Sequence, residues 1–373
     1  MVQIPHPNIP NVPKFMKALV LHDTEKSADV KDHPVPDLQD NDILVKVAYV
    51  AQNPTDWKHV EFWGKPKAID GCDFSGKVVA LGKNLKDDSW QIGDLAAGIA
   101  HGGQFPDRGA FAEYLRISST AAWKVPTSSS KVSLREAPVY GIGFGTACQA
   151  LYKRLDVPYP PAKVEGDKWF LVYGGSTSVG LFAVQLAKLA GYKVVATASP
   201  RNFDLVKQYG ADEVVDYHDS LAAIREIRTI TNCSLIRGLD TISEKGSLKI
   251  ALEALADNDD QGKPKLSILL LIPDESKMLA QSRGIHVETN WVYTCISDTF
   301  HFVDDITVEG IPEDREFYAK LCKDTPTFIE EYGIRPNPIT DMEGGLKGIF
   351  KGFELMKSGK VSASKLVYKV SDV

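Results

Sequence analysis

Short runs of apolar and β-branched residues, separated by Gly, Pro and Asp turns, mark the chain from Lys17 to about Pro138. The clearest of these runs cover residues 18–20, 43–50, 76–81 and 112–117. Short strands at this spacing are typical of an all-β unit. The first part of the chain is therefore predicted to form a compact, barrel-like domain.

The pattern changes at about Gly141. An apolar strand at 169–173 leads into a glycine-rich turn, then an amphipathic run through Leu189, then a second strand at 193–198. Strand, turn, helix and strand in this order predict a βαβ unit. Helical runs separate the further strands expected at residues 213–216, 238–242 and 266–272. The expected fold class is α/β, with a Rossmann doubly wound parallel sheet.

The last part of the chain has helical patterns at 315–332 and 345–358 and a β-rich run at 365–370. We expect these elements to return to the first domain. The predicted domains are thus residues 1–140 with 311–373, which would hold substrate, and residues 141–310, which would hold a nucleotide.

Charge and composition exclude several classes of function. The chain has 43 Lys and Arg against 49 Asp and Glu, a net charge of −6, and no basic block that would favour nucleic acid or a membrane surface. Its longest apolar runs fall well short of the roughly 20 residues that span a bilayer. No secretory signal is visible, and five widely spaced cysteines provide neither a disulfide framework nor a metal knuckle. A reduced, cytoplasmic protein that acts on a small molecule is expected.

The glycine-rich turn has the form that a dinucleotide requires. Its position after an apolar strand and before a helix places backbone amides and the helix dipole against a pyrophosphate. The turn departs from a strict GxGxxG, but it carries three hydroxyl groups that can donate to phosphate oxygens. A helix cap without a ligand is the alternative. The predicted cofactor-binding residues of the turn are Gly174, Gly175, Ser176, Thr177, Ser178, Val179 and Gly180.

The end of the second strand favours NADPH over NADH. NAD sites place an acidic residue about 20 residues beyond the turn, where it binds the ribose hydroxyls. Here the strand ends in Ser199-Pro200-Arg201-Asn202, without a carboxylate. Arg201 can form paired, charge-assisted bonds to a 2′-phosphate, and Ser199 can add one more. An exposed arginine with no ligand is the alternative.

The chain resembles a medium-chain dehydrogenase/reductase over nearly its whole length. The matching segments, each weak alone and specific together, are Asn53-Pro54-Thr55-Asp56, Gly71-Cys72-Asp73-Phe74-Ser75-Gly76, Gly93-Asp94, Gly109-Ala110-Phe111-Ala112-Glu113-Tyr114, the glycine turn, and Tyr209-Gly210-Ala211-Asp212. The resemblance is greatest to zinc-free fungal trans-acting enoyl reductases and yeast quinone-reductase-like proteins. It implies a GroES-like β-barrel domain beside the Rossmann domain.

The resemblance also bears on zinc. Alcohol dehydrogenases of the family carry a cysteine ligand where this chain has Asn53, and Gly-His-Glu where it has Gly71-Cys72-Asp73. The cysteines of their structural zinc lobe are missing from residues 96–104. We therefore expect no metal, with Cys72 a small buried residue and His59 and His101 loop or surface histidines. Without a Lewis acid, hydride transfer favours an activated double bond or a quinone.

The resemblance implies further site residues. Asn53, Thr55 and Asp56 would lie near the nicotinamide, and Tyr217, Lys365 and Leu366 would contact the cofactor. Lys58 would stabilise charge or deliver a proton, although a lysine on a helix is commonly only solvated. The segment expected to line an acyl pocket is Tyr140, Gly141, Ile142, Gly143, Phe144, Gly145 and Thr146, where glycines leave room or simply add flexibility.

The predicted function is an NADPH-dependent, zinc-independent reductase of a 2-enoyl or enone C=C bond. Its substrate would be a small molecule, with a carrier domain as a further partner, and the chain would be a monomer or a homodimer. Two alternatives stay open: a quinone oxidoreductase, and a non-catalytic NADPH-binding sensor or structural protein. No acid that would protonate the reduced substrate is evident from the sequence.

Overall fold

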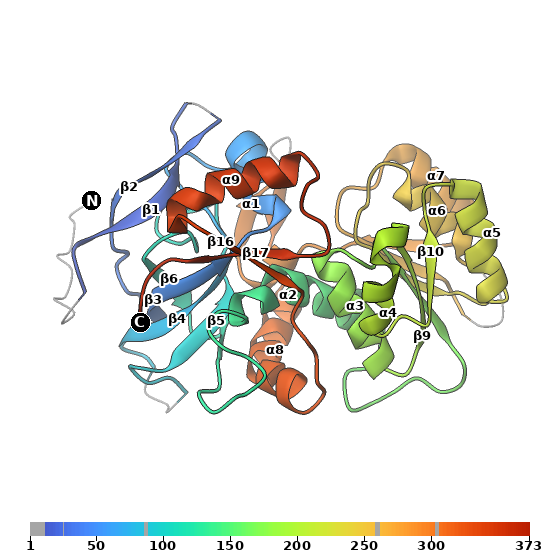
Figure 1. Ribbon diagram of the computed structural model, residues 1–373, viewed down its shortest axis with the longest axis horizontal. Helices are drawn as coiled ribbons and strands as arrows, with labels where there is room; N and C mark the ends of the chain where they lie inside the picture. Colours follow the sequence, from blue (N-terminus) through green and yellow to red (C-terminus); the bar gives the residue numbers. More distant parts are fainter. Residues whose placement is uncertain (1–11, 25, 86–88, 258–261, 303–305) are drawn as a thin grey trace. The chain divides into compact units, whose positions relative to one another are not determined.

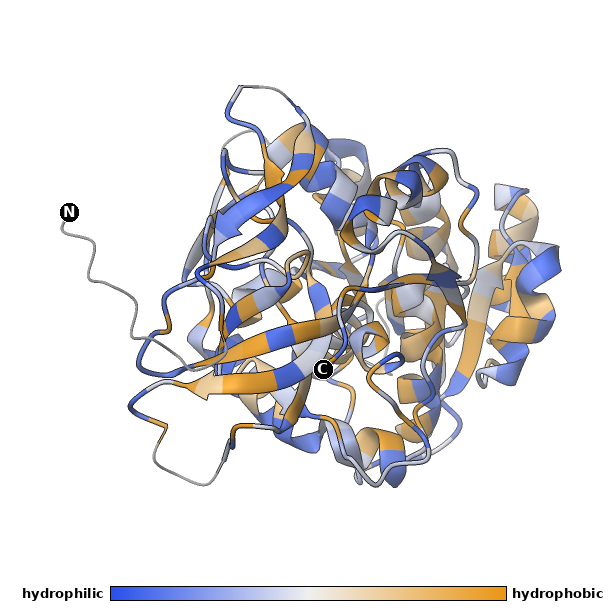
Figure 2. Ribbon diagram, turned by 60° about the vertical axis from the view of Figure 1, so that its left-hand side comes forward, coloured by the Kyte–Doolittle hydropathy of each residue, from blue (hydrophilic) through white to orange (hydrophobic). Residues whose placement is uncertain are grey.

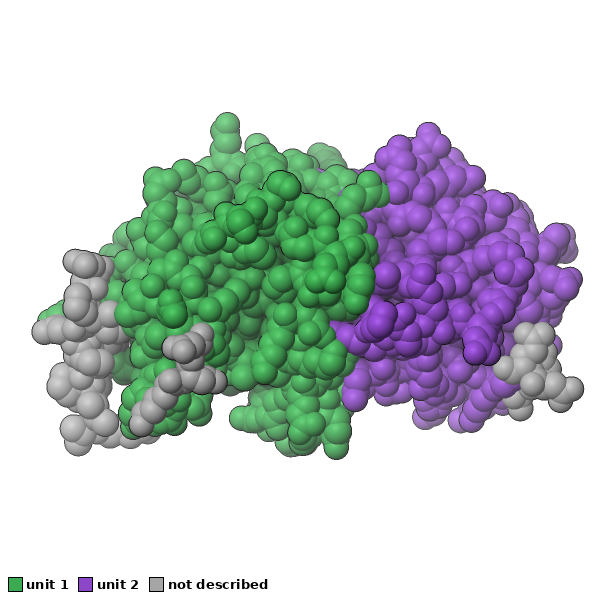
Figure 3. All heavy atoms as spheres, turned by 90° about the horizontal axis from the view of Figure 1, so that it is seen from below, with its two compact units in different colours: residues 1–142, 293–361, 365–373 green, residues 143–292, 362–364 purple. Residues whose placement is uncertain are grey.

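The computed structural model describes residues 12–24, 26–85, 89–257, 262–302 and 306–373. The chain divides into two compact units, shown in Figure 3. Unit 1 comprises residues 1–142, 293–361 and 365–373, and unit 2 comprises residues 143–292 and 362–364. Residues 293–310, which the sequence pattern placed with the nucleotide-binding segment, thus lie in unit 1.

Unit 1 is built on a seven-stranded sheet in the order β16-β17-β3-β4-β5-β7, with β6 paired to β3 (Figure 1). β17 pairs antiparallel with β3 and parallel with β16, so the last strand lies in the same sheet as the first long strand. Among the described strand pairs, β16 and β7 are the two end strands of this order. The strands are β3 (Asp42–Ala51), β4 (Asp73–Leu81), β5 (Leu95–Ile99), β6 (Tyr114–Ser118), β7 (Ala122–Lys124), β16 (Ile339–Met342) and β17 (Lys365–Lys369).

Two antiparallel strand pairs and several helices complete unit 1. The hairpin of β1 (Phe15–Leu21) and β2 (Ala28–Pro34) buries Met16, Ala18 and Val20 against a small core that includes Leu44 and Ile69. The other elements are α1 (Pro54–Lys58), η1 (His59–Trp63), η2 (Ala137–Tyr140), β14 (Thr299–His301), β15 (Thr307–Glu309), α8 (Pro312–Glu330) and α9 (Gly345–Lys357).

Unit 2 contains a six-stranded parallel sheet in the order β10-β9-β8-β11-β12-β13. This order, in which the chain moves outward in both directions from a central strand, is that of a doubly wound nucleotide-binding fold. Figure 1 shows α3 and α4 on one side of the strands and α5, α6 and α7 on the other. The strands are β8 (Trp169–Tyr173), β9 (Lys193–Ala198), β10 (Glu213–Asp216), β11 (Arg237–Asp240), β12 (Lys265–Ile268) and β13 (His286–Thr289).

The helices of unit 2 are α2 (Ile142–Gln149, whose first residue belongs to unit 1), η3 (Ala150–Arg154), α3 (Ser178–Leu189), η4 (Pro200–Asn202), α4 (Phe203–Gln208), α5 (Ser220–Ile230), α6 (Ser247–Ala254) and α7 (Asp274–Ser282). None of the described helices combines the length and apolar composition needed to cross a bilayer.

The predicted strand bounds in unit 2 are confirmed at β8, β9 and β10 and are too long at two later strands. β11 ends at Asp240, because its carboxylate accepts the backbone N–H groups of Ile242 and Ser243 and turns the chain. β12 ends at Ile268, and the apolar run continues as a bend in which Leu271 is exposed. Apolar residues alone therefore did not indicate where these strands leave the sheet.

The core of unit 2 lies where strands and helix faces meet. Figure 2 shows hydrophobic positions concentrated on strands and inner helix faces, and hydrophilic positions on loops. Leu171 of β8 is fully buried between its neighbouring strands and the helices. A strand that is covered on both faces reads as one continuous apolar run, as Trp169–Tyr173 does.

Replacing Leu171 with Ala should lower the free energy of unfolding by about 3 kcal/mol, because the cavity it leaves is closed on all sides. Leu221→Ala is the matched control: Leu221 lies in the same unit and is 59% exposed, so its loss should change stability by less than about 0.5 kcal/mol. Denaturant titration measures both. Equal effects would contradict the position of Leu171 in the core.

Candidate active site

The glycine turn of unit 2 links β8 to α3 with little space for side chains. Gly174 has φ +79°, a left-handed conformation that favours glycine. A Cβ atom on Gly180 would lie 2.1 Å from the carbonyl oxygen of Gly174, so the start of the helix packs directly on the turn. The same two glycines bring backbone amides to the N-terminus of α3, as pyrophosphate binding requires.

Thr177 caps the helix. Its hydroxyl accepts the Gly180 N–H at 2.9 Å and lies 2.9 Å from the hydroxyl of Thr241. Thr241 in turn donates to the Tyr173 carbonyl. The Thr177 hydroxyl accepts a hydrogen bond as a cap, so its own proton can go either to Thr241 or to a phosphate oxygen. Ser176 and Ser178 carry the other two hydroxyl groups of the turn.

The tip of β9 gathers polar groups from three segments of unit 2. The Ser199 hydroxyl lies 3.1 Å from the hydroxyl of Tyr217, and the Asn202 amide donates to Ser176 at 3.3 Å. Arg201 is exposed and has no hydrogen bond or ion pair with another described residue. The structure thus places Ser176, Ser199, Arg201 and Tyr217 at one end of the sheet. Asn202, which sequence reasoning did not select, joins the glycine turn to the tip.

A buried ion pair organises the polar residues of unit 1. The Lys365 ammonium lies 2.9 Å from Asp73 Oδ2 and also donates to the side-chain oxygen of Asn53. The Asn53 amide donates to the same carboxylate at 2.8 Å. All three side chains are at most 2% exposed. Asn53 and Lys365, which were predicted separately, therefore bond to each other and to Asp73.

Asp73 also fixes the start of α2. Its Oδ1 accepts the Ile142 N–H at 2.7 Å, and a Cβ atom on Gly141 would lie 2.1 Å from that oxygen. Gly141 thus allows a close approach of the backbone to the carboxylate. Tyr140, just before it, is buried and donates to the Ile334 carbonyl at 2.8 Å.

The rest of the predicted acyl segment belongs to unit 2 and is buried. Gly143, Phe144, Gly145 and Thr146 all lie within the covered part of α2. The Phe144 ring packs edge-on against Phe182, and a Cβ atom on Gly143 would meet the hydroxyl of Ser178. Gly143 therefore allows α2 to pack closely against α3.

Helix α1 positions the remaining predicted residues of unit 1. Asp56 is fully buried, and its carboxylate accepts the Asn53 N–H at 2.6 Å. Burial, together with the nearby Asp70 carboxyl, raises the pKa of Asp56 well above its usual range. Lys58, half-buried, holds its ammonium 5.8 Å from the centre of the Trp57 ring and 6.0 Å from that of Trp63.

The expectation that His59 and His101 are loop or surface residues is wrong for His59, which is buried in η1, whereas His101 lies in a loop but is also buried. Their exposed fractions are 2% and 3%, because each packs among aromatic rings and polar groups in the interior of unit 1. His59 Nδ1 lies 3.4 Å from Asp70 Oδ1, and its Nε2 lies 3.4 Å from the Thr55 hydroxyl. Burial lowers the pKa of His59 to about 3, so its imidazole is neutral near pH 7.

Tyr293 was also missed by sequence reasoning. Its hydroxyl lies 2.9 Å from that of Thr55 and 3.5 Å from the Cys72 sulfur. Its ring stacks on His101 with centroids 4.0 Å apart. Thr55 and Tyr293 are separated by 238 positions. No local pattern signals such a contact, and only the fold brings the two hydroxyls together.

The prediction that Cys72 is a small buried residue is confirmed, since its exposed fraction is 0%. Burial is the main cause that raises the pKa of its thiol well above the ordinary value. Asp56, His59 and Cys72 offer one donor atom each within 4.8 Å of one another, which makes them a possible metal-binding group.

Two of these donors also contact other side chains. His59 Nε2 faces the Thr55 hydroxyl, and the Cys72 thiol faces the hydroxyl of Tyr293. Asn53, which stands where the family's first cysteine ligand would be expected, and Asp73, in the segment that matches Gly-His-Glu, are both engaged with the Lys365 ammonium. A tetrahedral site needs its donor atoms turned toward one point.

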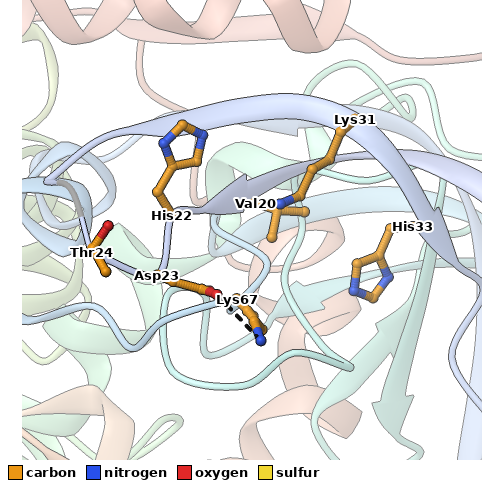
Figure 4. Close-up of a pocket in the computed structure, with 7 residues that line it drawn as sticks. All are labelled: Val20, His22, Asp23, Thr24, Lys31, His33 and Lys67. Carbon is orange, nitrogen blue, oxygen red and sulfur yellow. Dashed lines mark ion pairs between the residues drawn. The ribbon is translucent and has the colours of Figure 1, made fainter.

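A pocket of about 400 Å³ lies elsewhere in unit 1, on the β1–β2 hairpin (Figure 4). It is lined by Val20, His22, Asp23, Thr24, Lys31, His33 and Lys67. Lys67 pairs with Asp23 at 3.3 Å, and His22 bonds Asp29. None of the predicted site residues lines this pocket.

Comparison with known proteins agrees with this geometry. The family profile described as "Alcohol dehydrogenase GroES-like domain" matches residues 39–127, and the profile described as "Zinc-binding dehydrogenase" matches residues 178–260. The chain is 38% identical to "Trans-enoyl reductase ACTTS2" of Alternaria alternata, with 95% of this chain and 98% of that protein covered. The chain belongs to the medium-chain dehydrogenase/reductase family. The predicted resemblance and fold class are confirmed.

Other relatives support the same family. "Trans-enoyl reductase caaB" of Aspergillus niger is 35% identical to this medium-chain dehydrogenase/reductase over 97% of the chain and 99% of its own length. Among solved structures, the quinone oxidoreductase from Coxiella burnetii has a TM-score of 0.68 at 24% identity, with 96% of this chain and 100% of that chain covered. A mycobacterial protein, Rv1454c, complexed with NADPH, has a TM-score of 0.71 at 19% identity, with coverage of 95% and 99%. These structures share the fold.

Replacing Asp73 with Asn should lower the free energy of unfolding by about 3 kcal/mol, because the Lys365 ammonium would stay buried without its counterion. The double variant Asp73→Asn with Lys365→Met should recover part of this loss. Denaturant titration of the variants measures both effects.

Asp167→Asn is the control, since it breaks the exposed pair of Lys193 and Asp167. Its effect should be no more than about 0.5 kcal/mol. A loss at Asp73 as small as this one would contradict the structural role of the buried pair.

Proposed function

We propose that this chain is an NADPH-dependent, zinc-independent reductase that transfers hydride to the C=C bond of a 2-enoyl group. The observation that carries the proposal is the Lys365 ammonium, which engages Asn53, where the family's first cysteine ligand would be expected, and Asp73, in the segment that matches Gly-His-Glu. Without a Lewis acid, a double bond already activated by a conjugated carbonyl is the favoured acceptor. The names of the trans-enoyl reductase relatives support the same substrate class.

NADPH would bind through unit 2. The amides at the start of α3 suit a pyrophosphate, and Arg201 is the cation that suits a 2′-phosphate. Ser199 and Tyr217 would flank the adenosine ribose from one side of the β9 tip. In unit 1, Lys365 and Leu366 would present backbone groups to the nicotinamide side. When bound, NADPH supplies the hydride.

The chain's own residues would orient the substrate and stabilise charge. Asp73 holds the Asn53 amide and the Lys365 ammonium in fixed positions, so neither has to reorganise during the reaction. Thr55 is half-buried and carries the hydroxyl of α1, which would face the substrate. The Lys58 ammonium, held beside two indole rings, would add positive potential for the negative charge that develops on the enolate oxygen.

A carrier-bound acyl chain is the form of substrate that we propose, with a free thioester as its simplest analogue. Quinone reduction is the second candidate, favoured by the fold shared with the Coxiella burnetii quinone oxidoreductase. A protein that binds NADPH without turnover is the third.

The purified protein should oxidise NADPH in the presence of a short 2-enoyl thioester, with less than about 0.1 zinc ions per chain by elemental analysis. Activity should survive treatment with a chelator. Loss of activity on chelation, restored by zinc, would overturn zinc independence. Quenching of tryptophan fluorescence by NADPH without turnover of thioester, enone or quinone would favour the non-catalytic alternative.

Replacing Arg201 with Asp should raise the Michaelis constant for NADPH by at least about tenfold and that for NADH by less than about twofold, because only NADPH has the 2′-phosphate. Steady-state rates with each cofactor measure the effect. Arg225→Asp makes the same charge change at an exposed position of α5 and should alter neither constant. Equal increases for both cofactors in Arg201→Asp would refute the assignment.

A further inference from the structure

Reduction of a conjugated C=C bond needs a proton as well as a hydride. Hydride adds to the β-carbon, the π electrons move to the carbonyl oxygen, and the α-carbon must then receive a proton. Sequence reasoning found no acid for this step. The inference below rests on the proposed reductase function and identifies the source of that proton.

We propose that Asp70, His59 and Thr55 form a proton relay that delivers the proton to the reduced substrate. The three side chains lie in one line of contacts within unit 1. Asp70 Oδ1 lies 3.4 Å from His59 Nδ1, and His59 Nε2 lies 3.4 Å from Thr55 Oγ1. Catalytic hydrogen bonds are often this long before substrate binds, and they tighten in the complex.

The relay runs from the interior toward the surface. Asp70 is 0% exposed and His59 is 2% exposed, whereas Thr55 is half-buried. Within the described residues, His59 Nδ1 and the two side-chain oxygens of Asp70 have no hydrogen bond of good geometry. The Gly71 backbone N–H still acts on the Asp70 carboxyl and opposes the rise of its pKa. A buried carboxyl without a good partner is costly. The Asp70 carboxyl lies beside an imidazole nitrogen that also lacks a hydrogen bond, and this arrangement points to a functional role for the two residues.

The proton transfers balance in charge and atoms. The α-carbon takes the Thr55 hydroxyl proton, Thr55 takes the proton from His59 Nε2, and His59 Nδ1 takes the carboxylic proton of Asp70. The imidazole stays neutral overall and changes tautomer, and Asp70 becomes a carboxylate. After product leaves, water returns a proton through Thr55 to His59 Nε2, and His59 Nδ1–H returns its proton to Asp70. Both the tautomer and the acid are then restored.

The protonation states of the resting site suit this sequence. Burial raises the pKa of the Asp70 carboxyl to about 8, so it carries its proton at pH 7, and the low pKa of His59 keeps the ring neutral. The other titratable groups around the pair are Asp56, Cys72 and His101. Burial raises the pKa of Cys72 and lowers that of His101, so both are neutral at pH 7, and burial also raises the pKa of Asp56 well above its usual range.

Tyr293 is not the net source of the proton, although its hydroxyl also contacts Thr55. Burial raises its pKa well above 10, and its other polar neighbour is the Cys72 thiol, whose pKa is raised too. A proton given up by Tyr293 would leave a buried tyrosinate with no acid to restore it. Among the described contacts of Thr55, the His59 side leads to Asp70, whose pKa of about 8 lets it lose a proton near neutral pH.

The first test replaces Asp70 with Asn, which keeps the shape of the carboxyl but has no proton to pass. With NADPH and a 2-enoyl thioester, kcat should fall by about 10²-fold or more, with the Michaelis constant for NADPH within about twofold of its original value. In the unaltered protein kcat should decrease as the pH rises through about 8, since the acid form is lost there. This alkaline decrease should be missing in Asp70→Asn.

Asp314→Asn is the matched control, because Asp314 is also a fully buried carboxyl of unit 1 and bonds Thr294. It should keep both kcat and the alkaline decrease. Thr55→Val and Thr55→Ser provide a second pair at a less buried position: Val should lose activity as Asp70→Asn does, and Ser, which keeps the hydroxyl, should recover it. An Asp70→Asn or Thr55→Val protein with unchanged kcat and pH profile would overturn the relay.

A measurement on the resting protein separates the relay from the proposed function. The ¹⁵N signals of the His59 ring should shift as the pH passes through about 8, because Asp70 loses its proton beside Nδ1, and this shift should be absent in Asp70→Asn. A ring that does not sense this titration would overturn the relay even where the enzyme reduces thioesters. A protein with the titration but without turnover would overturn the reductase function instead.

Discussion

The buried contact between the Lys365 ammonium and the Asp73 carboxylate is the interaction on which unit 1 most depends. Two opposite charges removed from water are stable only when each is paired and hydrogen-bonded. Here the carboxylate also accepts the Asn53 amide and the Ile142 N–H, so one side chain joins β4, β17, the start of α1 and the start of α2. The same ammonium also donates to Asn53, at the position where the family's first cysteine ligand would be expected.

The fold was largely predictable because its main signals are local. The apolar run Trp169–Tyr173, the glycine turn and the run to Ala198 form consecutive elements, and each limits its neighbours. A strand buried on both faces must be apolar throughout, and a turn that packs a helix against it needs glycine where a Cβ atom would collide. Such constraints act over a few residues and can be recognised without the tertiary structure.

The polar interior of unit 1 was only partly predictable. Asn53, Thr55 and Asp56 were selected because they resemble a family motif, but their partners Asp70 and Tyr293 carry no local signal. His59 and His101 were misassigned because a histidine in a polar stretch gives no sign of burial. His59 of η1 packs against the Tyr293 ring, and His101 stacks on the same ring, so both are buried by a residue that comes nearly 200 or more positions later in the chain.

The pairing of β17 with β3 has a consequence for how the chain acquires its structure. Val367 pairs with Ala51, so the N-terminal sheet gains a central strand only after all of unit 2 has been synthesised. Contacts this distant in sequence form slowly, whereas unit 2 draws almost entirely on one continuous segment. During translation, unit 2 can therefore fold before Lys365 has been synthesised and can pair with the Asp73 carboxylate. Until β17 forms, residues 49–51 at the end of β3 lack their partner strand, although β6 already pairs with residues 42–46. An unpaired strand end of this kind can bind another chain.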